Sequence, residues 1–149
     1  MPEQIKHYIS EVLHRITPNE ITVLLPEQIF CFESDLIGKH SKGAAKQAMN
    51  WGAKLGKSIG IQGRTYSIPT KGRAVNITLT VAEIKPFVDD YIEYARKHPK
   101  LTFLTTLIGC GLSKYKPKDI APLFEKAIEV HNVYLPEKFW HKLGYVENE

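Results

Sequence analysis

Apolar residues recur at two spacings along the chain, and these spacings predict an alternation of helices and strands. Helical spacing occupies residues 4–16 and 80–97 and resumes from Asp119. Runs typical of β-strands lie at residues 21–25, 29–32, 65–68, 101–107 and 133–134. This alternation predicts an α/β protein with a three-layer α/β/α sheet. No linker or repeat interrupts the pattern, so we expect a single domain over 1–149, with an N-terminal helix over 3–16 packed on it.

Several helices and turns carry recognisable start and stop signals. Thr80 followed by Glu83 is a capping box, while Pro86 one turn later predicts a kink or a restart of the helix. Near the N-terminus, Arg15 lies away from the apolar stripe, on the polar side of the expected helix. Glycines mark residues 56–63 as a loop, and 136–143 predict a terminal helix.

Three polar segments that contain glycine each follow a predicted strand, at residues 34–46, 69–73 and 108–116. In open α/β sheets ligands bind beyond the carboxyl ends of the strands, so we expect the three segments to converge on one crevice. The second segment contains a predicted Pro-Thr-Lys-Gly turn. In the first, Gly38 permits a bend, and a helix that begins near Gly43 would direct its free amides and positive dipole end toward the loop. Such a loop suits an anion.

Charge is distributed unevenly, and this strengthens the case for an anionic ligand. Residues 36–82 contain eight Lys or Arg and no Asp or Glu, so the remainder of this +4 chain sums to −4. A phosphate-bearing partner over this surface would explain such a block, although a solvated basic face is the simpler alternative. The eight cations are Lys39, Lys42, Lys46, Lys54, Lys57, Arg64, Lys71 and Arg73.

Other functional classes find little support in the sequence. No segment approaches the roughly 20 apolar residues of a membrane span, and no signal-peptide pattern opens the chain, so a cytoplasmic protein without membrane contact is expected. The histidines show no metal-ligand spacing, and we expect neither a metal nor a cofactor. Cys31 and Cys110 form no Cys-x-x-Cys pair, and Cys110 between two glycines is more typical of packing than of a nucleophile. Walker A and GxSxG motifs are absent.

The polar segments carry a resemblance to a known family. Four blocks occur in order: Asp35-Leu36-Ile37-Gly38, Lys42-Gly43-Ala44-Ala45, Ile68-Pro69-Thr70-Lys71 and Ile108-Gly109-Cys110-Gly111-Leu112. They resemble macro domains of the DNA ADP-ribosyl glycohydrolase antitoxin type, which show Asn-x-x-Gly, Lys-Gly-x-Ala, a Phe-Pro-Thr-Lys turn and a Gly-Cys-Gly loop. Over residues 29 to 124 the chain also resembles an uncharacterised family of bacterial and phage proteins. The resemblance implies a macro domain-like mixed sheet.

The same resemblance implies ADP-ribose or a related nucleotide as the ligand. The first loop and the Gly-Cys-Gly loop would hold the diphosphate and distal ribose through backbone amides, and Lys71 would be the catalytic base or nucleophile at an anomeric carbon. Asp35 replaces the family Asn and is the second catalytic candidate, or instead holds a ribose hydroxyl. The expected ligand-binding residues are Ser34, Gly38, Lys39, His40, Ser41, Lys42, Gly43, Ala44, Thr70, Ile108, Gly109, Cys110, Gly111, Leu112 and Tyr115.

Three functional hypotheses follow. The first is binding of ADP-ribose or a related nucleotide, with hydrolysis of an ADP-ribosyl linkage as a further activity; in a non-catalytic version Lys71 only neutralises phosphate. The second is a non-enzymatic nucleic-acid-binding or phage-associated protein that uses the basic face. The third is a structural role in which the glycine segments are only turns. The sequence gives no oligomeric state.

Overall fold

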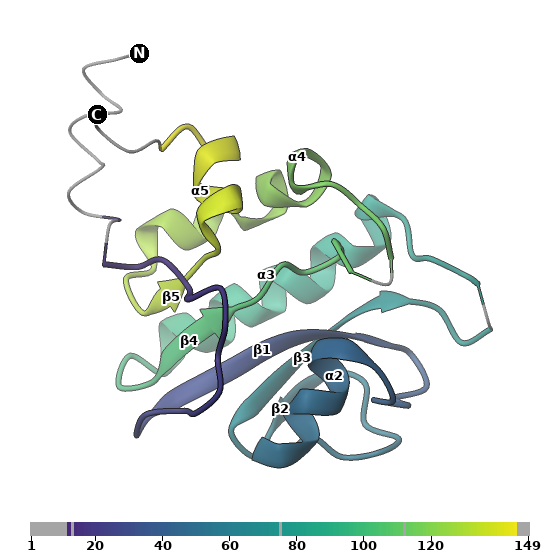
Figure 1. The fold of residues 1–149 in the computed structure, drawn as a ribbon. Coiled ribbons are helices and arrows are strands. Elements are labelled where there is room, and N and C mark those ends of the chain that lie inside the picture. Colours follow the sequence, from purple (N-terminus) through teal and green to yellow (C-terminus); the bar gives the residue numbers. More distant parts are fainter. Residues whose placement is uncertain (1–11, 13, 75, 112, 146–149) are drawn as a thin grey trace.

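A mixed five-stranded sheet forms the centre of the fold (Figure 1). The computed structural model describes residues 12, 14–74, 76–111 and 113–145. The strand order is β2-β3-β1-β4-β5, with β1 and β4 parallel to their neighbours and β2 antiparallel to β3. The bounds are β1 Gln28–Asp35, β2 Gly60–Gln62, β3 Thr65–Lys71, β4 Thr102–Thr105 and β5 Val133–Tyr134.

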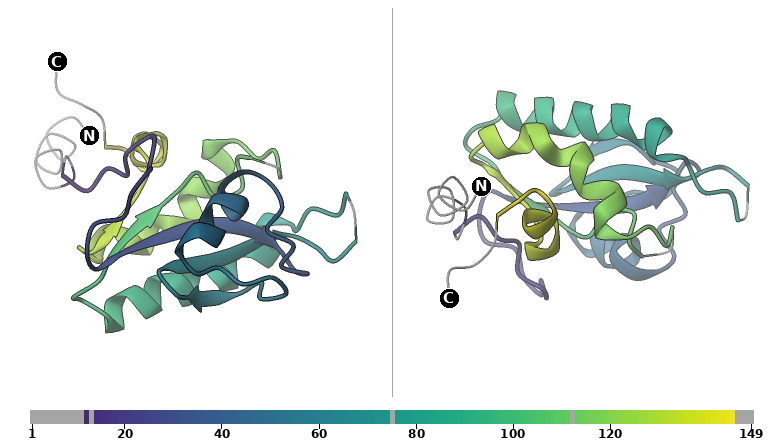
Figure 2. Two further views of the ribbon diagram at one scale, coloured as in Figure 1. Left: turned by 60° about the horizontal axis from the view of Figure 1, so that its bottom comes forward. Right: turned by 90° about the horizontal axis from the view of Figure 1, so that it is seen from above.

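Helices lie on both faces of the sheet, which confirms the predicted three-layer α/β/α arrangement (Figures 1 and 2). The long helix α3 packs against β3 and alongside the 3₁₀ helix η2, whereas the short helix α2 packs on β1 from the opposite face. The helix α5 packs on α4 and η2. The bounds are α2 Gly43–Ala48, η1 Met49–Trp51, α3 Val81–Lys97, α4 Pro117–Ile120, η2 Ala121–Glu129 and α5 Glu137–Lys142.

The central strand β1 is buried on both faces because it lies between two hydrophobic clusters. Ile29 and Cys31 belong to the larger cluster beneath α3, and Phe30 and Phe32 belong to the smaller cluster beneath α2. Side chains alternate along a strand, so the next residue, Glu33, falls on the α3 side near the carboxyl end. A carboxylate is thereby placed at an inward-facing position.

The capping box at the start of α3 is confirmed. The Thr80 Oγ1 accepts from the Glu83 amide at 3.1 Å, and the Glu83 carboxylate accepts from the Thr80 amide at 2.8 Å. The predicted restart at Pro86 is wrong, because α3 runs without interruption through that residue. Pro86 lacks an amide to bond the Ala82 carbonyl, and both residues are exposed, so water can satisfy that carbonyl.

The predicted strand at 21–25 is wrong. This segment joins no sheet, and Val23 and Leu25 are 69% and 60% exposed. Side chains secure its backbone instead: Gln47 donates to the Ile21 carbonyl, and the Leu25 amide donates to the Gln28 side chain at 2.9 Å. The prediction relied on apolar content alone, and a strand forms only where a neighbouring strand is available for pairing.

Two further expectations about the backbone need correction. The predicted loop at 56–63 contains β2, which pairs with β3, and the predicted turn at 69–72 is largely the end of β3. Ser34 is paired with Pro69 but Asp35 with Lys71, so the register between β1 and β3 shifts by one residue. Thr70 is the additional residue, and its side chain turns toward β1.

The predicted N-terminal helix lies mostly outside the described residues; Val12 is helical and buried, whereas residues 14–16 form a turn, a bend and a bridge. Ile16 forms a parallel bridge with Leu135.

Arg15, expected on the polar side, is only 2% exposed, and its guanidinium lies 5.1 Å from the Trp140 ring centroid. That guanidinium donates to the carbonyls at the end of η2 and at β5, those of Ala127, Ile128, Val130 and Val133. The prediction of an exposed Arg15 was wrong, because the carbonyls that accept from it lie more than 110 residues away in the chain and local periodicity could not reveal them.

Candidate functional site

The three glycine segments meet at one edge of the sheet, as the parallel strand order requires. β1, β3 and β4 all end at this edge, and the Glu33 carboxylate joins the segments that follow them. It accepts hydrogen bonds from the Thr70 hydroxyl at 2.8 Å and from the amides of Gly109 and Gly111 at 3.2 and 3.0 Å. Thr70 Oγ1 also lies 2.7 Å from Ser113 Oγ. The three segments therefore meet at one edge, as predicted, but residues 108–116 line neither of the two cavities found beside the first two segments, so convergence on a single crevice is not confirmed.

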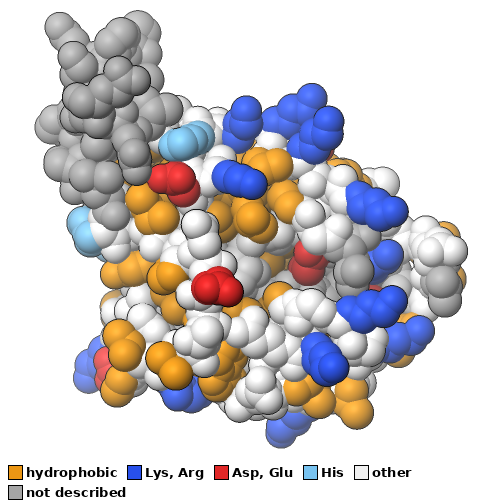
Figure 3. All heavy atoms as spheres, in the orientation of Figure 1, with side chains coloured by type: hydrophobic (Ala, Val, Ile, Leu, Met, Phe, Trp, Pro, Cys, Tyr) orange, Lys and Arg blue, Asp and Glu red, His pale blue; other side chains and the backbone are white. Residues whose placement is uncertain are grey.

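A basic crevice of about 290 Å³ lies where the first and second segments meet. We define it by four cations, of which Lys71 is half-buried and the others are exposed. Ser41 and Asp35 also line it, and Asp35 is the acid among its lining residues. Figure 3 shows Lys and Arg side chains along the side of the molecule where these strands end. The four cations are Lys39, Lys42, Lys71 and Arg73.

Asp35 shapes the first loop. Its Oδ1 accepts from the amides of Ile37, Gly38 and Lys39 at 2.9, 2.6 and 3.3 Å. Gly38 has a φ of +77°, and a Cβ there would lie 2.7 Å from the Lys57 amide nitrogen. These contacts correct the expectation that the Gly38 amide faces a ligand, because Asp35 already accepts from it. Asp35 lines the crevice as well, so its predicted contact to a ligand hydroxyl stays a prediction.

Ser34 and His40 anchor the loop to the segment before β2. The Ser34 hydroxyl donates to the Ser58 carbonyl at 2.9 Å and accepts from Ser67 at 2.6 Å. His40 is 4% exposed, and its Nε2 lies 3.0 Å from the Lys57 carbonyl oxygen. Both residues were predicted to bind ligand, but internal partners occupy these polar atoms.

A smaller inner cavity of about 40 Å³ adjoins the basic crevice, and the two share Asp35, Ser41, Lys42 and Lys71. Glu33 and His40 also line it, and the His40 Nδ1 is buried without a hydrogen-bond partner among the described residues. Such a volume accommodates ordered water or a ligand hydroxyl. The inner cavity is therefore polar and small, and its size excludes a base or a sugar ring.

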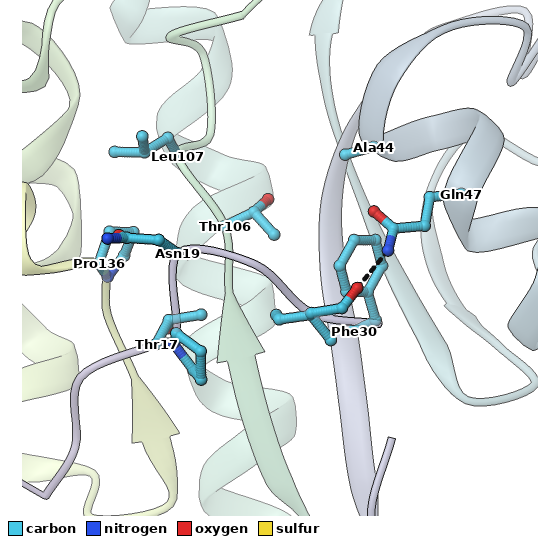
Figure 4. Close-up of a pocket in the computed structure, with 10 residues that line it drawn as sticks. Thr17, Asn19, Phe30, Ala44, Gln47, Thr106, Leu107 and Pro136 are labelled. Carbon is cyan, nitrogen blue, oxygen red and sulfur yellow. Dashed lines mark hydrogen bonds between the residues drawn. The ribbon is translucent and has the colours of Figure 1, made fainter. Parts of the chain in front are cut away.

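The other side of the first loop carries a second opening, the α2 pocket, of about 240 Å³ (Figure 4). In Figure 4, Ala44 and Gln47 of α2 lie on one side of it and Thr106 and Leu107 on the other, with Phe30 between them. Sequence reasoning assigned only Ala44 to the site. No local signal could have identified the others, because five separate segments supply the lining. The remaining lining residues are Thr17, Pro18, Asn19, Ile21 and Pro136.

The glycine loop after β4 holds its own side chains in place. Ile108 is fully buried, and the Tyr115 hydroxyl donates to the Leu79 carbonyl at 2.6 Å. Burial, with the nearby Glu33 and Asp119 charges, raises the pKa of the Cys110 thiol to about 11. A thiol with a raised pKa is a poor nucleophile, as expected of a packing residue. Leu112, also predicted to bind ligand, lies outside the described residues.

Sequence reasoning missed Glu33, which is central to this edge. Burial raises its pKa above the ordinary 4.5, and hydrogen bonds from Thr70, Gly111 and Gly109, with the charge of Lys71, oppose the shift only in part. The sequence did contain a signal that could have identified Glu33, because it is an acidic residue at an inward-facing position of a predicted buried strand. Because Glu33 accepts from Thr70 and both glycine amides, the predicted ligand contacts of these groups are corrected to internal contacts.

The raised pKa of Glu33 gives a pH-dependent prediction. Folding favours the protonated form, so this contribution to the free energy of unfolding is fully present below the unfolded pKa, about 4.3, and is lost as pH rises through the folded value. The wild-type chain should therefore lose stability relative to Glu33→Gln as the pH rises above the ordinary pKa of a glutamate and through the raised folded value. Urea unfolding of both chains at a series of pH values from acidic to neutral measures the difference. A difference independent of pH, or one that favours the wild type at higher pH, would contradict the prediction.

Comparison with known proteins gives no family assignment. Among the described residues, no group of three or more His, Cys, Asp and Glu side chains is arranged to hold a metal, and none of the described helices is long and apolar enough to cross a membrane. No family model matches the chain, and neither a curated protein nor a solved structure is significantly similar to it.

Proposed function

We propose that the chain binds ADP-ribose or a related nucleotide derivative at the carboxyl edge of the sheet. The observation that carries the proposal is the basic crevice, where four cations surround about 290 Å³ of open volume. Asp35, the acid in its lining, has one carboxylate oxygen engaged by three backbone amides, so part of its charge is compensated within the loop. A site of this kind favours an anionic ligand such as a diphosphate.

The position of the α2 pocket supports a ligand with both anionic and apolar parts. The segment 41–47 lies between the two openings, since Ser41 and Lys42 line the basic crevice while Ala44 and Gln47 line the α2 pocket. Phe30, Ile21, Leu107 and Pro136 supply apolar surface, which suits a planar base. A nucleotide laid across the start of α2 would place its phosphates among the cations and its base in the α2 pocket.

Calorimetry with ADP-ribose, AMP and cyclic ADP-ribose tests the proposal. We expect Lys42→Ala and Lys71→Ala each to raise the Kd for ADP-ribose about tenfold, because each removes a charge-assisted hydrogen bond to phosphate. Lys97→Ala is the matched control, since Lys97 is exposed at the far end of α3 from this edge. The absence of heat with all three ligands at millimolar concentration would contradict the proposal.

Nucleic-acid binding is the second candidate, because half of the cations in the acid-free segment lie outside the basic crevice. These exposed residues are Lys46, Lys54, Lys57 and Arg64. A duplex or single strand bound over them should show an affinity that falls steeply with salt, by about one unit of log–log slope per phosphate contacted. A site for a small nucleotide should show a much weaker salt dependence than this.

A further inference from the structure

The anion-binding amides of the glycine loop already have an occupant within the chain. We propose that Glu33 is an internal anion that fills the site formed by the Gly109 and Gly111 amides and the Thr70 hydroxyl, and so excludes phosphate from it. Glu33 is then a residue that determines specificity. In its absence the same three donors would accept a phosphate or carboxylate from solution.

The three donors are arranged as they would be around a bound oxyanion. One carboxylate oxygen accepts from Thr70 and Gly109, and the other accepts from Gly111 at 3.0 Å. Thr70 has one hydroxyl proton, which goes to the carboxylate. Ser113 Oγ lies 2.7 Å from Thr70 Oγ1 and 3.2 Å from the Thr70 carbonyl oxygen, so its single proton is available to either acceptor, and both contacts hold Thr70 beside the carboxylate.

Gly111 fits closely against the carboxylate. A Cβ at that position would lie 2.7 Å from Glu33 Oε1, so a side chain is excluded unless the carboxylate moves. The Gly111 residue itself is exposed, so a solvent anion could approach its amide if the carboxylate were removed. The close contact of Gly111 with the carboxylate and the exposure of Gly111 to solvent together indicate an anion site that Glu33 of the same chain occupies.

The partners of Glu33 are those of an anion site and differ from those of an ion pair. The ion pairs found within the described part of the chain are Lys85 with Asp89 and Arg96 with Glu93, both on α3. Glu33 is thus held by neutral N–H and O–H groups. Lys71 lowers its pKa through charge but makes no ion pair with it in the described structure. Backbone amides and a hydroxyl are the usual donors to bound phosphate.

The consequence for a bound nucleotide rests on the proposed function. A buried carboxylate repels phosphate but accepts a hydrogen bond from a hydroxyl. The phosphates would therefore bind at Lys39, Lys42, Lys71 and Arg73, and a ribose-type hydroxyl would face Glu33 through the inner cavity.

Titration of the full chain with inorganic pyrophosphate tests the internal anion directly. The readout is the pair of Gly109 and Gly111 amide signals in two-dimensional NMR spectra. In the wild type we expect no saturable shift of these two signals. In Glu33→Ala we expect saturable shifts of both and at least about tenfold tighter pyrophosphate binding, because two amides and a hydroxyl become available. Lys97→Ala should behave like the wild type.

Two outcomes would overturn the inference: saturable shifts of both glycine signals in the wild type, or no shift in Glu33→Ala. Should Glu33→Ala fail to fold, Glu33→Gln provides the test. Its NH₂ group cannot accept a hydrogen bond, so at least one glycine amide should respond to pyrophosphate; a response equal to that of the wild type would again refute the inference. Pyrophosphate contains no nucleoside, so this result stands whether or not ADP-ribose binds.

Discussion

Replacing Arg15 with Ala should destabilise the protein by about 4 kcal/mol, among the largest effects of any single substitution. The guanidinium is buried and donates to four backbone carbonyls that belong to η2, its end and β5. Without it the Ile128 and Val133 carbonyls would lose these donors, the Ala127 and Val130 carbonyls would keep only the backbone amides of Val130 and Val133, and the negative end of η2 would lose its compensating charge. Urea unfolding followed by circular dichroism measures the loss.

Two further variants serve as comparisons for this prediction. Arg15→Lys should recover only a small part of the stability, because an ammonium group cannot reach four acceptors in the plane of a guanidinium. Arg96→Ala removes an exposed arginine from a surface ion pair on α3 and should change the free energy of unfolding by no more than about 0.5 kcal/mol. If Arg15→Ala cost as little as Arg96→Ala, the buried hydrogen-bond network would not contribute to stability.

Replacing Lys71 with Arg should lower the rate of ADP-ribose release from modified DNA by about 10² to 10⁴, if the chain has the hydrolase activity that the macro-domain resemblance implies. Arginine keeps the positive charge beside the phosphates but cannot act as base or nucleophile. Lys71 is half-buried and lines both the basic crevice and the inner cavity, which places its amine beside the proposed ribose position. Chromatography of released ADP-ribose measures the rate.

The comparison of binding and rate separates the two roles of Lys71. We expect Lys71→Arg to keep the Kd for ADP-ribose near that of the wild type, whereas Lys71→Ala should weaken binding and also abolish release. A wild-type rate in Lys71→Arg would remove Lys71 from the chemistry and leave it as a phosphate contact. Binding of ADP-ribose without release by the wild-type chain would indicate a binding protein.

Much of the site was predictable because its geometry follows from strand direction. Strands that run parallel end at the same edge, so the segments after β1, β3 and β4 had to lie near one another. The absence of acids from residues 36–82 likewise pointed to the cations that line the basic crevice, Lys39, Lys42, Lys71 and Arg73. The α2 pocket was beyond prediction, since residues as distant as Thr17 and Pro136 line it together.

The sequence by itself determined the features that depend on neighbours in the chain: the capping box of α3, the apolar strand β1, the glycine bend at Gly38 and the uneven distribution of charge. Tertiary structure decided which polar groups remain available to a ligand. Glu33 reaches Gly111 across 78 residues, and Arg15 reaches the end of η2 across more than 110. A buried charge takes whatever donors or acceptors the folded chain brings to it, because leaving it unpaired costs several kcal/mol. Local sequence carries no information about which partners those will be.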